Sequence, residues 1–90
     1  MPRIRWFVYV VRCADRSLYT GIARDVAKRL AAHSKGTGSR CLSGRLPILL
    51  VHQEVRFSRS AALKREAAIK RLTRVQKEAL ILKKDAEQHV

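Results

Sequence analysis

Residues 6–22 have the sequence WFVYVVRCADRSLYTGI, which predicts a β-hairpin. Residues 6–13 are β-branched and aromatic without clean alternation, a pattern typical of a strand that is covered on both faces. A turn over Ala14–Ser17 follows, and the returning strand covers Leu18–Ile22. Gly21 is unusual inside a strand and indicates a bulge or a close approach to the backbone.

Beyond the hairpin, the sequence predicts one helix and a third strand. Asp25 is suited to cap a helix that runs to about Lys35, and Gly36 is well placed to end it. The third strand begins after Pro47 and extends to about Val55.

Two further helices are expected in the C-terminal part of the chain. Ser58 or Ser60 caps a helix that runs through Leu72, and Thr73 with Gln76 forms a capping box for the last helix. The predicted fold is therefore α+β, with a small, mostly antiparallel three-stranded sheet flanked by helices in the order ββαβαα.

Length and composition indicate a single domain over residues 1–90, with a core over about 6–82 and frayed termini. A hydrophobic fraction of 47% excludes wholesale disorder. The apolar runs are far shorter than the roughly 20 residues that a membrane span requires, and no secretory signal is visible. Cys13 and Cys41 are too few for a disulfide framework or a four-ligand zinc site, so we expect reduced thiols in a cytoplasmic protein.

The charge balance predicts a polyanionic partner. Lys and Arg number 20 against 7 Asp and Glu, a formal net charge of +13, and the basic residues are spread along the whole chain. A charge of this size opposes compactness, and Arg outnumbers Lys by 13 to 7, which favours bidentate contacts to phosphate. Nucleic acid is the first candidate, and a solvated surface without such a partner is the alternative.

Three polar residues lie beside apolar positions of the predicted helices. Arg29 and His33 are one turn apart at the edge of an apolar stripe. Arg29 either extends to solvent or holds an anion over a cleft, and His33 is either a semi-buried structural histidine or a catalytic one. Glu66 falls in the apolar sector of a basic helix, where a carboxylate is costly without a cation. An ion pair with Lys70 and a metal ligand are the two explanations.

Tyr9 and Tyr19 lie on the two strands of the predicted hairpin, where either could serve ordinary sheet packing. They face the same side only if the loop between the strands has an odd number of residues. The obvious four-residue turn, Ala14–Ser17, would place them on opposite faces. A shared site therefore predicts a loop of three or five residues, or a bulge.

Taken together, these residues resemble the GIY-YIG nuclease domain, and the small stand-alone bacterial branch of that superfamily in particular. The resemblance spans about Trp6 to about Leu82 and rests on an ordered set of residues: Phe7-Val8-Tyr9, Tyr19-Thr20-Gly21, Arg29, His33 and Glu66. Phe7, Val8 and Thr20 depart from the motif letters. The chain also contains no Asn, whereas many nucleases of the family use a late Asn in the site.

The resemblance implies hydrolysis of phosphodiester bonds in DNA with one divalent metal ion, Mg²⁺ or Mn²⁺. Glu66 would hold the metal, and Arg29 would hold the phosphate. Tyr9 or Tyr19 would deprotonate or orient the attacking water, with His33 relaying the proton. A phenol is a weak base at neutral pH, and we expect Arg29 and the metal to favour the phenolate.

Contacts to the DNA backbone are expected around the same cleft. Gly21 would let the substrate or a water molecule approach the backbone. Five basic residues would neutralise phosphates: Arg24, Lys28, Lys35, Arg40 and Arg45. Nothing suggests a separate sequence-reading element, so branched, damaged or single-stranded DNA, as in DNA repair, is favoured over a defined recognition sequence.

Two alternatives remain open from the sequence. One is a nucleic-acid-binding module, for DNA or RNA, that keeps the fold without effective catalysis, which the missing Asn favours. The other is a structural partner of RNA or ribosomes, for which the basic surface suffices, although it leaves the position of Glu66 unexplained. No membrane partner is expected, and the sequence does not indicate an oligomeric state.

Overall fold

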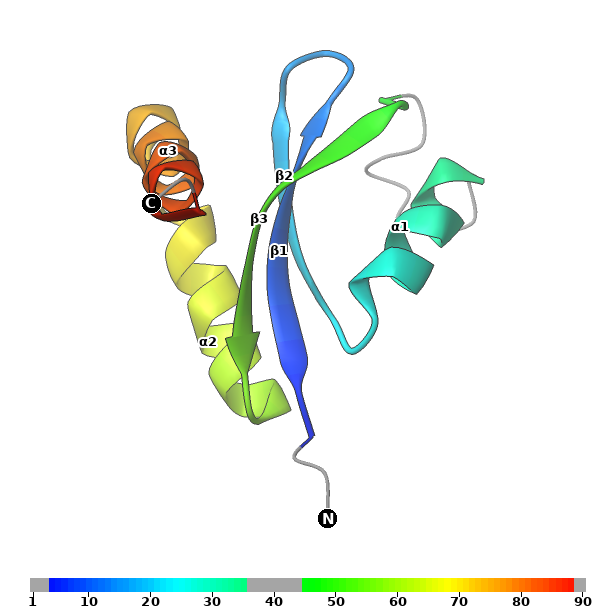
Figure 1. The fold of residues 1–90 in the computed structure, drawn as a ribbon, viewed down its shortest axis with the longest axis vertical. Coiled ribbons are helices and arrows are strands. Elements are labelled where there is room, and N and C mark those ends of the chain that lie inside the picture. The colour runs from blue at the N-terminus through cyan, green and yellow to red at the C-terminus, as the bar shows by residue number, and fades with distance from the viewer. Residues whose placement is uncertain (1–3, 36–44, 89–90) are drawn as a thin grey trace.

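The computed structural model describes residues 4–35 and 45–88. Three antiparallel strands form a sheet in the order β2-β1-β3, with α1 on one side and α2 and α3 on the other (Figure 1). The elements are β1 (Trp6–Cys13), β2 (Leu18–Ala23), α1 (Val26–Ser34), β3 (Ile48–Arg56), α2 (Arg59–Lys70) and α3 (Arg74–Gln88). The predicted α+β class and the order ββαβαα are confirmed.

The register of the hairpin places both tyrosines on one face of the sheet. Tyr9 pairs with Gly21, and Val11 pairs with Tyr19. Cross-strand partners face the same side, and so do residues two apart on one strand. Tyr9 and Tyr19 therefore share the face that α1 covers, as the hypothesis of a common site requires.

A three-residue loop, residues 14–16, produces this register. The Cys13 amide donates to the Ser17 carbonyl at 2.9 Å, and the Arg16 amide donates to the Cys13 carbonyl at 2.9 Å. Arg16 has a φ of 70°, the left-handed conformation that ends a three-residue hairpin loop. The predicted turn Ala14–Ser17 does lie between the two strands. Because Cys13 faces Ser17, however, the register closes a three-residue loop, and the odd number that a shared site predicts is confirmed.

The sheet separates two hydrophobic cores. On the face of Tyr9, buried residues from the hairpin pack against Val26 of α1 and the partly buried Leu30. On the other face, Val8 and Val10 pack against residues that α2 and α3 supply: Ala62, Ile69, Leu80 and Ile81. The central strand β1 is thus covered on both sides, as its unbroken apolar run predicted. Cys13 lies buried in the first core as a free thiol, and Cys41 is outside the described residues.

The helix starts follow the predicted capping residues. Asp25 accepts a hydrogen bond from the Lys28 amide at 3.0 Å. Ser58, rather than Ser60, caps α2 by accepting from the Ala61 amide at 3.0 Å. The capping box is formed at the start of α3, where the side chains of Thr73 and Gln76 each accept from the other residue's amide.

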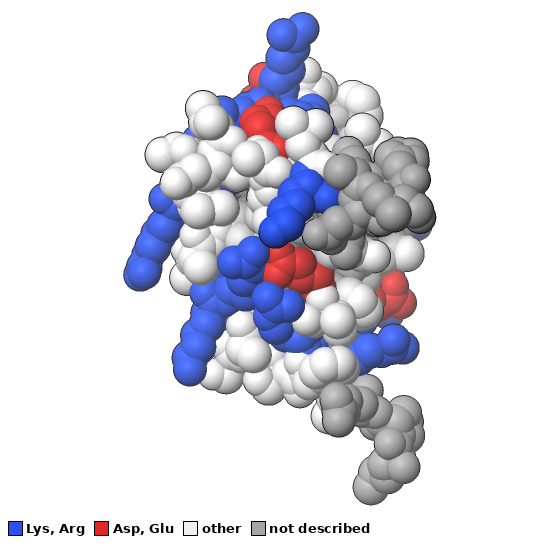
Figure 2. Space-filling model, turned by 60° about the vertical axis from the view of Figure 1, so that its left-hand side comes forward, with Lys and Arg blue, Asp and Glu red and all other residues white. Residues whose placement is uncertain are grey.

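Basic side chains are distributed over the folded surface. Figure 2 shows Lys and Arg across the side of the molecule that carries α2 and α3, with acidic side chains lying between them. The charge thus belongs to the folded domain and is not confined to a tail. None of the helices in the described segments combines the length and apolarity that a bilayer crossing requires.

Candidate active site

Tyr9 and His33 form a buried polar pair between β1 and α1. Tyr9 is 1% exposed and His33 is 2% exposed, and the Tyr9 Oη lies 3.1 Å from the His33 Nε2. The Tyr19 ring packs edge-on against the same imidazole, with the ring centroids 6.0 Å apart. Both hairpin tyrosines therefore meet the histidine of α1.

Gly21 makes room for the Tyr9 ring. A Cβ atom at Gly21 would lie 2.7 Å from the Tyr9 Oη, 2.8 Å from its Cζ and 3.2 Å from the Tyr19 Cε1. Carbon atoms normally approach one another to about 3.5–4.0 Å, so any larger residue here would displace the ring. The predicted close approach at Gly21 is thus made by the phenol of Tyr9.

Replacing Gly21 by Ala is expected to lower the free energy of unfolding by about 1–3 kcal/mol, because Tyr9 must move within a packed core. Urea unfolding measures this change. Replacing an unconstrained strand glycine by Ala would instead raise the free energy of unfolding by about 0.5–1 kcal/mol. The sign of the change therefore shows whether Tyr9 closely approaches Gly21. A stabilised variant would contradict the close approach.

Burial and charge act in opposite directions on the Tyr9 phenol. Burial raises the pKa of Tyr9 above its usual value of 10.0, the hydrogen bond and charge of Arg29 lower it, and the charges of Tyr19 and Glu66 raise it further. The effect of burial on the pKa is larger than that of Arg29, so without a metal the phenol stays protonated at neutral pH. Arg29 lowers the pKa of Tyr9, as expected, but not enough to favour the phenolate. The charges of Tyr19, Arg29 and Glu66 thus all act on the Tyr9 phenol, with the effect of Glu66 the smallest of those named.

His33 is placed to exchange a proton with Tyr9. Burial lowers the pKa of His33 below its usual 6.5, and the charge of Arg29 lowers it further. The imidazole is therefore neutral at neutral pH, with one ring nitrogen able to accept a hydrogen bond. When Nδ1 carries the proton, Nε2 accepts from the Tyr9 hydroxyl, which is the geometry of a proton relay.

Glu66 is the carboxylate that α2 contributes to this region. Its side chain is 18% exposed, and its Oε2 lies 3.6 Å from the Nζ of Lys70, which is largely exposed. The ion pair with Lys70 that the sequence allowed is therefore present. Such a pair between a surface lysine and a carboxylate contributes little free energy, so a cation of higher charge could take the place of the lysine.

A charge network between β3 and α2 fixes the orientation of the helix that carries Glu66. Arg65 donates from Nε and Nη2 to the Glu54 carboxylate at 2.8 and 3.0 Å, and the His52 Nε2 lies 2.7 Å from the same carboxylate. Burial raises the pKa of Glu54, but the hydrogen bonds from Arg65 and His52 outweigh burial and hold it at about 2. Because Arg65 adjoins Glu66, this contact restrains where Glu66 points.

The donor set suits a cation that one carboxylate shares with the substrate. Within residues 4–35 and 45–88, no group of three His, Cys, Asp or Glu side chains lies together to hold a metal ion. Mg²⁺ is commonly bound by one or two carboxylates, several waters and a substrate phosphate. Glu66 supplies one carboxylate whose charge acts on the Tyr9 phenol, so the residues present fit a cation bound by one carboxylate, water and a substrate phosphate.

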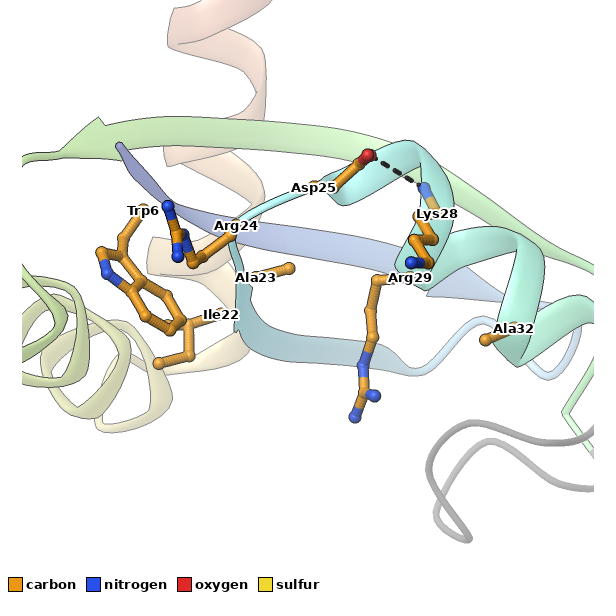
Figure 3. Close-up of a pocket in the computed structure, with 8 residues that line it drawn as sticks. All are labelled: Trp6, Ile22, Ala23, Arg24, Asp25, Lys28, Arg29 and Ala32. Atoms are coloured by element: carbon orange, nitrogen blue, oxygen red, sulfur yellow. Dashed lines mark hydrogen bonds between the residues drawn. The ribbon is translucent and has the colours of Figure 1, made fainter. Parts of the chain in front are cut away.

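A pocket of about 450 Å³ lies beside this cluster, at the outer edge of β2. Trp6 and Ile22 line one end, and α1 supplies Lys28 and Arg29 at the other (Figure 3). Arg24 extends over the Trp6 ring, with its guanidinium carbon 6.0 Å from the ring centroid. Arg29 thus both lines the pocket and acts on Tyr9, which places the pocket next to the buried tyrosine.

The predicted DNA contacts do not all meet at this pocket. Arg24 and Lys28 line it, whereas Lys35 lies exposed at the C-cap of α1. Arg45 lies at the tip of the hairpin, where its carbonyl accepts from the Ala14 amide and its Nε is 3.6 Å from the Asp15 carboxylate. Arg40 is outside the described residues.

Trp6 and the network around Glu54 were not identified as site features from the sequence. The available signal was that Trp6 is the one tryptophan of the chain and stands at the start of a strand. A carboxylate at Glu54, inside a largely apolar strand, was the corresponding signal for the network.

Comparison with known proteins shows the family to which the chain belongs. The model of the GIY-YIG catalytic domain family matches residues 5–79, a range that includes every predicted catalytic residue. A UPF0213 protein of Vibrio cholerae is 52% identical over 77 residues, which are 84% of this chain and 76% of the relative. A UPF0213 protein of Cronobacter sakazakii is 49% identical over 76 residues, covering 84% and 80%.

Two solved structures share the fold. The solution NMR structure of a UPF0213 protein from Bacillus halodurans is similar with a TM-score of 0.56 and 36% identity, covering 86% of this chain and 82% of that chain. The solution NMR structure of a protein from E. faecalis gives a TM-score of 0.59 and 37% identity, covering 84% and 82%.

Proposed function

Because the chain belongs to the GIY-YIG catalytic domain family, we propose that it is a metal-dependent endonuclease that hydrolyses phosphodiester bonds in DNA. The observation that carries the proposal is the buried hydrogen bond between Tyr9 and His33, with Arg29 and Glu66 acting on the same phenol. A tyrosine hydrogen-bonded to a neutral histidine supplies a proton relay, an arginine that acts on the same phenol supplies an anion contact, and a carboxylate on α2 supplies a cation ligand.

The side chains divide the reaction between them. Arg29 binds the scissile phosphate and offsets the negative charge that builds up in the transition state. Tyr9 first loses its proton through His33 Nε2 to the solvent, and the resulting phenolate takes a proton from the attacking water. Glu66 holds the divalent ion, which when bound acts as a Lewis acid on the phosphate. Gly21 keeps the phenol in place by leaving room for it.

We infer DNA of irregular structure, rather than a defined sequence, as the substrate. Three basic residues line the pocket beside the cluster: Arg24, Lys28 and Arg29. Contacts from such side chains to phosphates carry no information about the base sequence. Lys35, Arg40 and Arg45 remain proposed contacts to the DNA backbone.

A cleavage assay tests the proposal. Supercoiled, linear, single-stranded and branched DNA would be incubated with the purified protein and Mg²⁺ or Mn²⁺, with EDTA as the control. We expect cutting of at least one irregular substrate that EDTA abolishes and that Arg29→Ala reduces by about 10²- to 10³-fold, the cost of losing one donor to a developing charge. Lys83→Ala, an exposed basic residue of α3, is the matched control.

Tight, salt-sensitive binding without cutting would instead establish a nucleic-acid-binding module. Two features favour this second candidate: no three potential metal ligands lie together among the described residues, and the chain contains no Asn. Competition between RNA and DNA at matched salt would then identify the preferred partner, because affinity for either falls steeply with salt.

A further inference from the structure

The proposed nuclease mechanism leaves the Trp6 end of the pocket without a role. Trp6 is partly buried, packs against the core beneath α2, and still lines a pocket in a strongly basic surface. Arg24 lies over its ring, and Arg29 of α1 lines the pocket farther from Trp6 (Figure 3). Arg29 also acts on the Tyr9 phenol. An aromatic platform and two guanidinium groups therefore line one continuous space.

We propose that this pocket binds one unpaired nucleobase of the DNA strand, stacked on Trp6 and covered by Arg24. The inference rests on the proposed function, because it places the phosphate next to the bound base at Arg29. The strand that is cut would therefore be locally single-stranded. Indole and guanidinium planes are the side chains on which bases of single-stranded nucleic acid stack.

Arg24 can open to admit an inserted ring. A base between two parallel planes needs about two contact distances of ~3.5 Å, or ~7 Å in all. The Arg24 guanidinium carbon lies 6.0 Å from the Trp6 centroid, so Arg24 must move outward when the base enters. Arg24 is exposed and makes no ion pair with another described residue, which leaves its side chain free to make that shift.

The pocket also suits a base in size and chemistry. Its volume of about 450 Å³ lies within the range typical of small-ligand sites. Trp6, Ile22, Ala23 and Ala32 give it apolar surface, and the Asp25 carboxylate is occupied in capping α1. Stacking without hydrogen bonds to base edges does not discriminate between bases, so the pocket selects an unpaired base rather than a sequence.

Fluorescence of the protein tests the stacking directly, because Trp6 is its sole tryptophan. Wild-type protein in EDTA would be titrated with a short oligothymidylate and with an abasic oligonucleotide of equal phosphate number, while anisotropy of an end label follows binding. We expect saturable quenching of Trp6 by the oligothymidylate, and at most slight quenching by the abasic strand at equal occupancy. Equal or absent quenching with both strands would overturn the proposal.

Variants test the contribution of the ring to affinity. Trp6→Leu should weaken binding of the oligothymidylate by ~5- to 150-fold, the range found for loss of one base–aromatic stack, and binding of the abasic strand by less than ~2-fold. Trp6→Phe should retain part of the difference, and Lys83→Ala should weaken both strands equally and slightly. Equal losses for both strands in Trp6→Leu would show a purely structural role for Trp6.

The binding measurements test the base pocket independently of the nuclease proposal, because they are made without metal and need no cleavage. Base-dependent quenching without cleavage in Mg²⁺ would retain the base pocket and reject the nuclease. Cleavage without base-dependent quenching would reject the pocket and retain the nuclease.

Discussion

Replacing Glu66 by Gln should reduce metal-dependent cleavage by at least ~10³-fold while leaving DNA binding intact or tighter. A divalent ion acting on a phosphate contributes several kcal/mol to transition-state stabilisation, and ~1.4 kcal/mol corresponds to a tenfold rate. Removing one negative charge from a protein of net charge +13 favours rather than opposes association with DNA. Single-turnover cleavage and anisotropy binding, measured on the same substrate, check the two parts.

Glu78→Gln is the matched control for the Glu66 variant. Glu78 is a carboxylate of α3 that accepts a bidentate hydrogen bond from Arg12, at 2.7 and 3.0 Å, away from the tyrosines. Its replacement alters an ion pair of the hairpin without touching the proposed cation ligand. If Glu66→Gln folds by circular dichroism and cuts at the wild-type rate, Glu66 does not hold the metal.

Local signals in the sequence were sufficient for the elements of the fold. The bounds of β1 and the caps at Asp25, Ser58 and Thr73 follow from residues that act within a few positions of themselves. The sequence narrowed the hairpin loop to three or five residues, or a bulge, but did not select among them. Arg16 adopts a positive φ although it is neither Gly nor Asn, so its residue type gave no signal for this turn. Turn chemistry therefore located the turn but not its register, which the parity argument from the two tyrosines predicted.

The sequence predicts the site only where its residues lie on one helix or strand and are related by their spacing. Arg29 and His33 were found by their one-turn spacing, but their convergence with Glu66 depends on how α1 and α2 meet the hairpin from opposite sides. The pocket beside Trp6 depends on that same packing. Likewise, Glu54 and Arg65 meet through the contact of β3 with α2, which no local pattern encodes.

Tyr9 and Tyr19 differ in their hydrogen bonding and exposure, which decides between them as the proton-transfer group. Tyr9 has the hydrogen bond to His33 and the contact with Arg29, yet it is 1% exposed. Tyr19 is partly buried and packs edge-on against the His33 ring. We assign the role to Tyr9 because proton transfer requires a hydrogen bond to the accepting group.

Replacing Tyr9 by Phe should slow cleavage by about 10²- to 10⁴-fold, the range for loss of a general acid–base group. The ring remains packed over Gly21, and the lost hydrogen bond to His33 costs about 1 kcal/mol of folding free energy, so the variant should still fold. Tyr19→Phe is the matched control and should keep most of the activity.

The pH profile separates a proton-transfer role from a structural one. Because the pKa of Tyr9 is raised above 10.0, the phenol is protonated at neutral pH, and its deprotonated fraction grows as the pH rises. Cleavage by the wild type should therefore accelerate from neutral to mildly alkaline pH, by up to about tenfold per pH unit, in a chemistry-limited assay. Tyr9→Phe should lose this slope, and Tyr19→Phe should retain it. A flat wild-type profile would remove the tyrosine base, and a slope lost only in Tyr19→Phe would transfer the role to Tyr19.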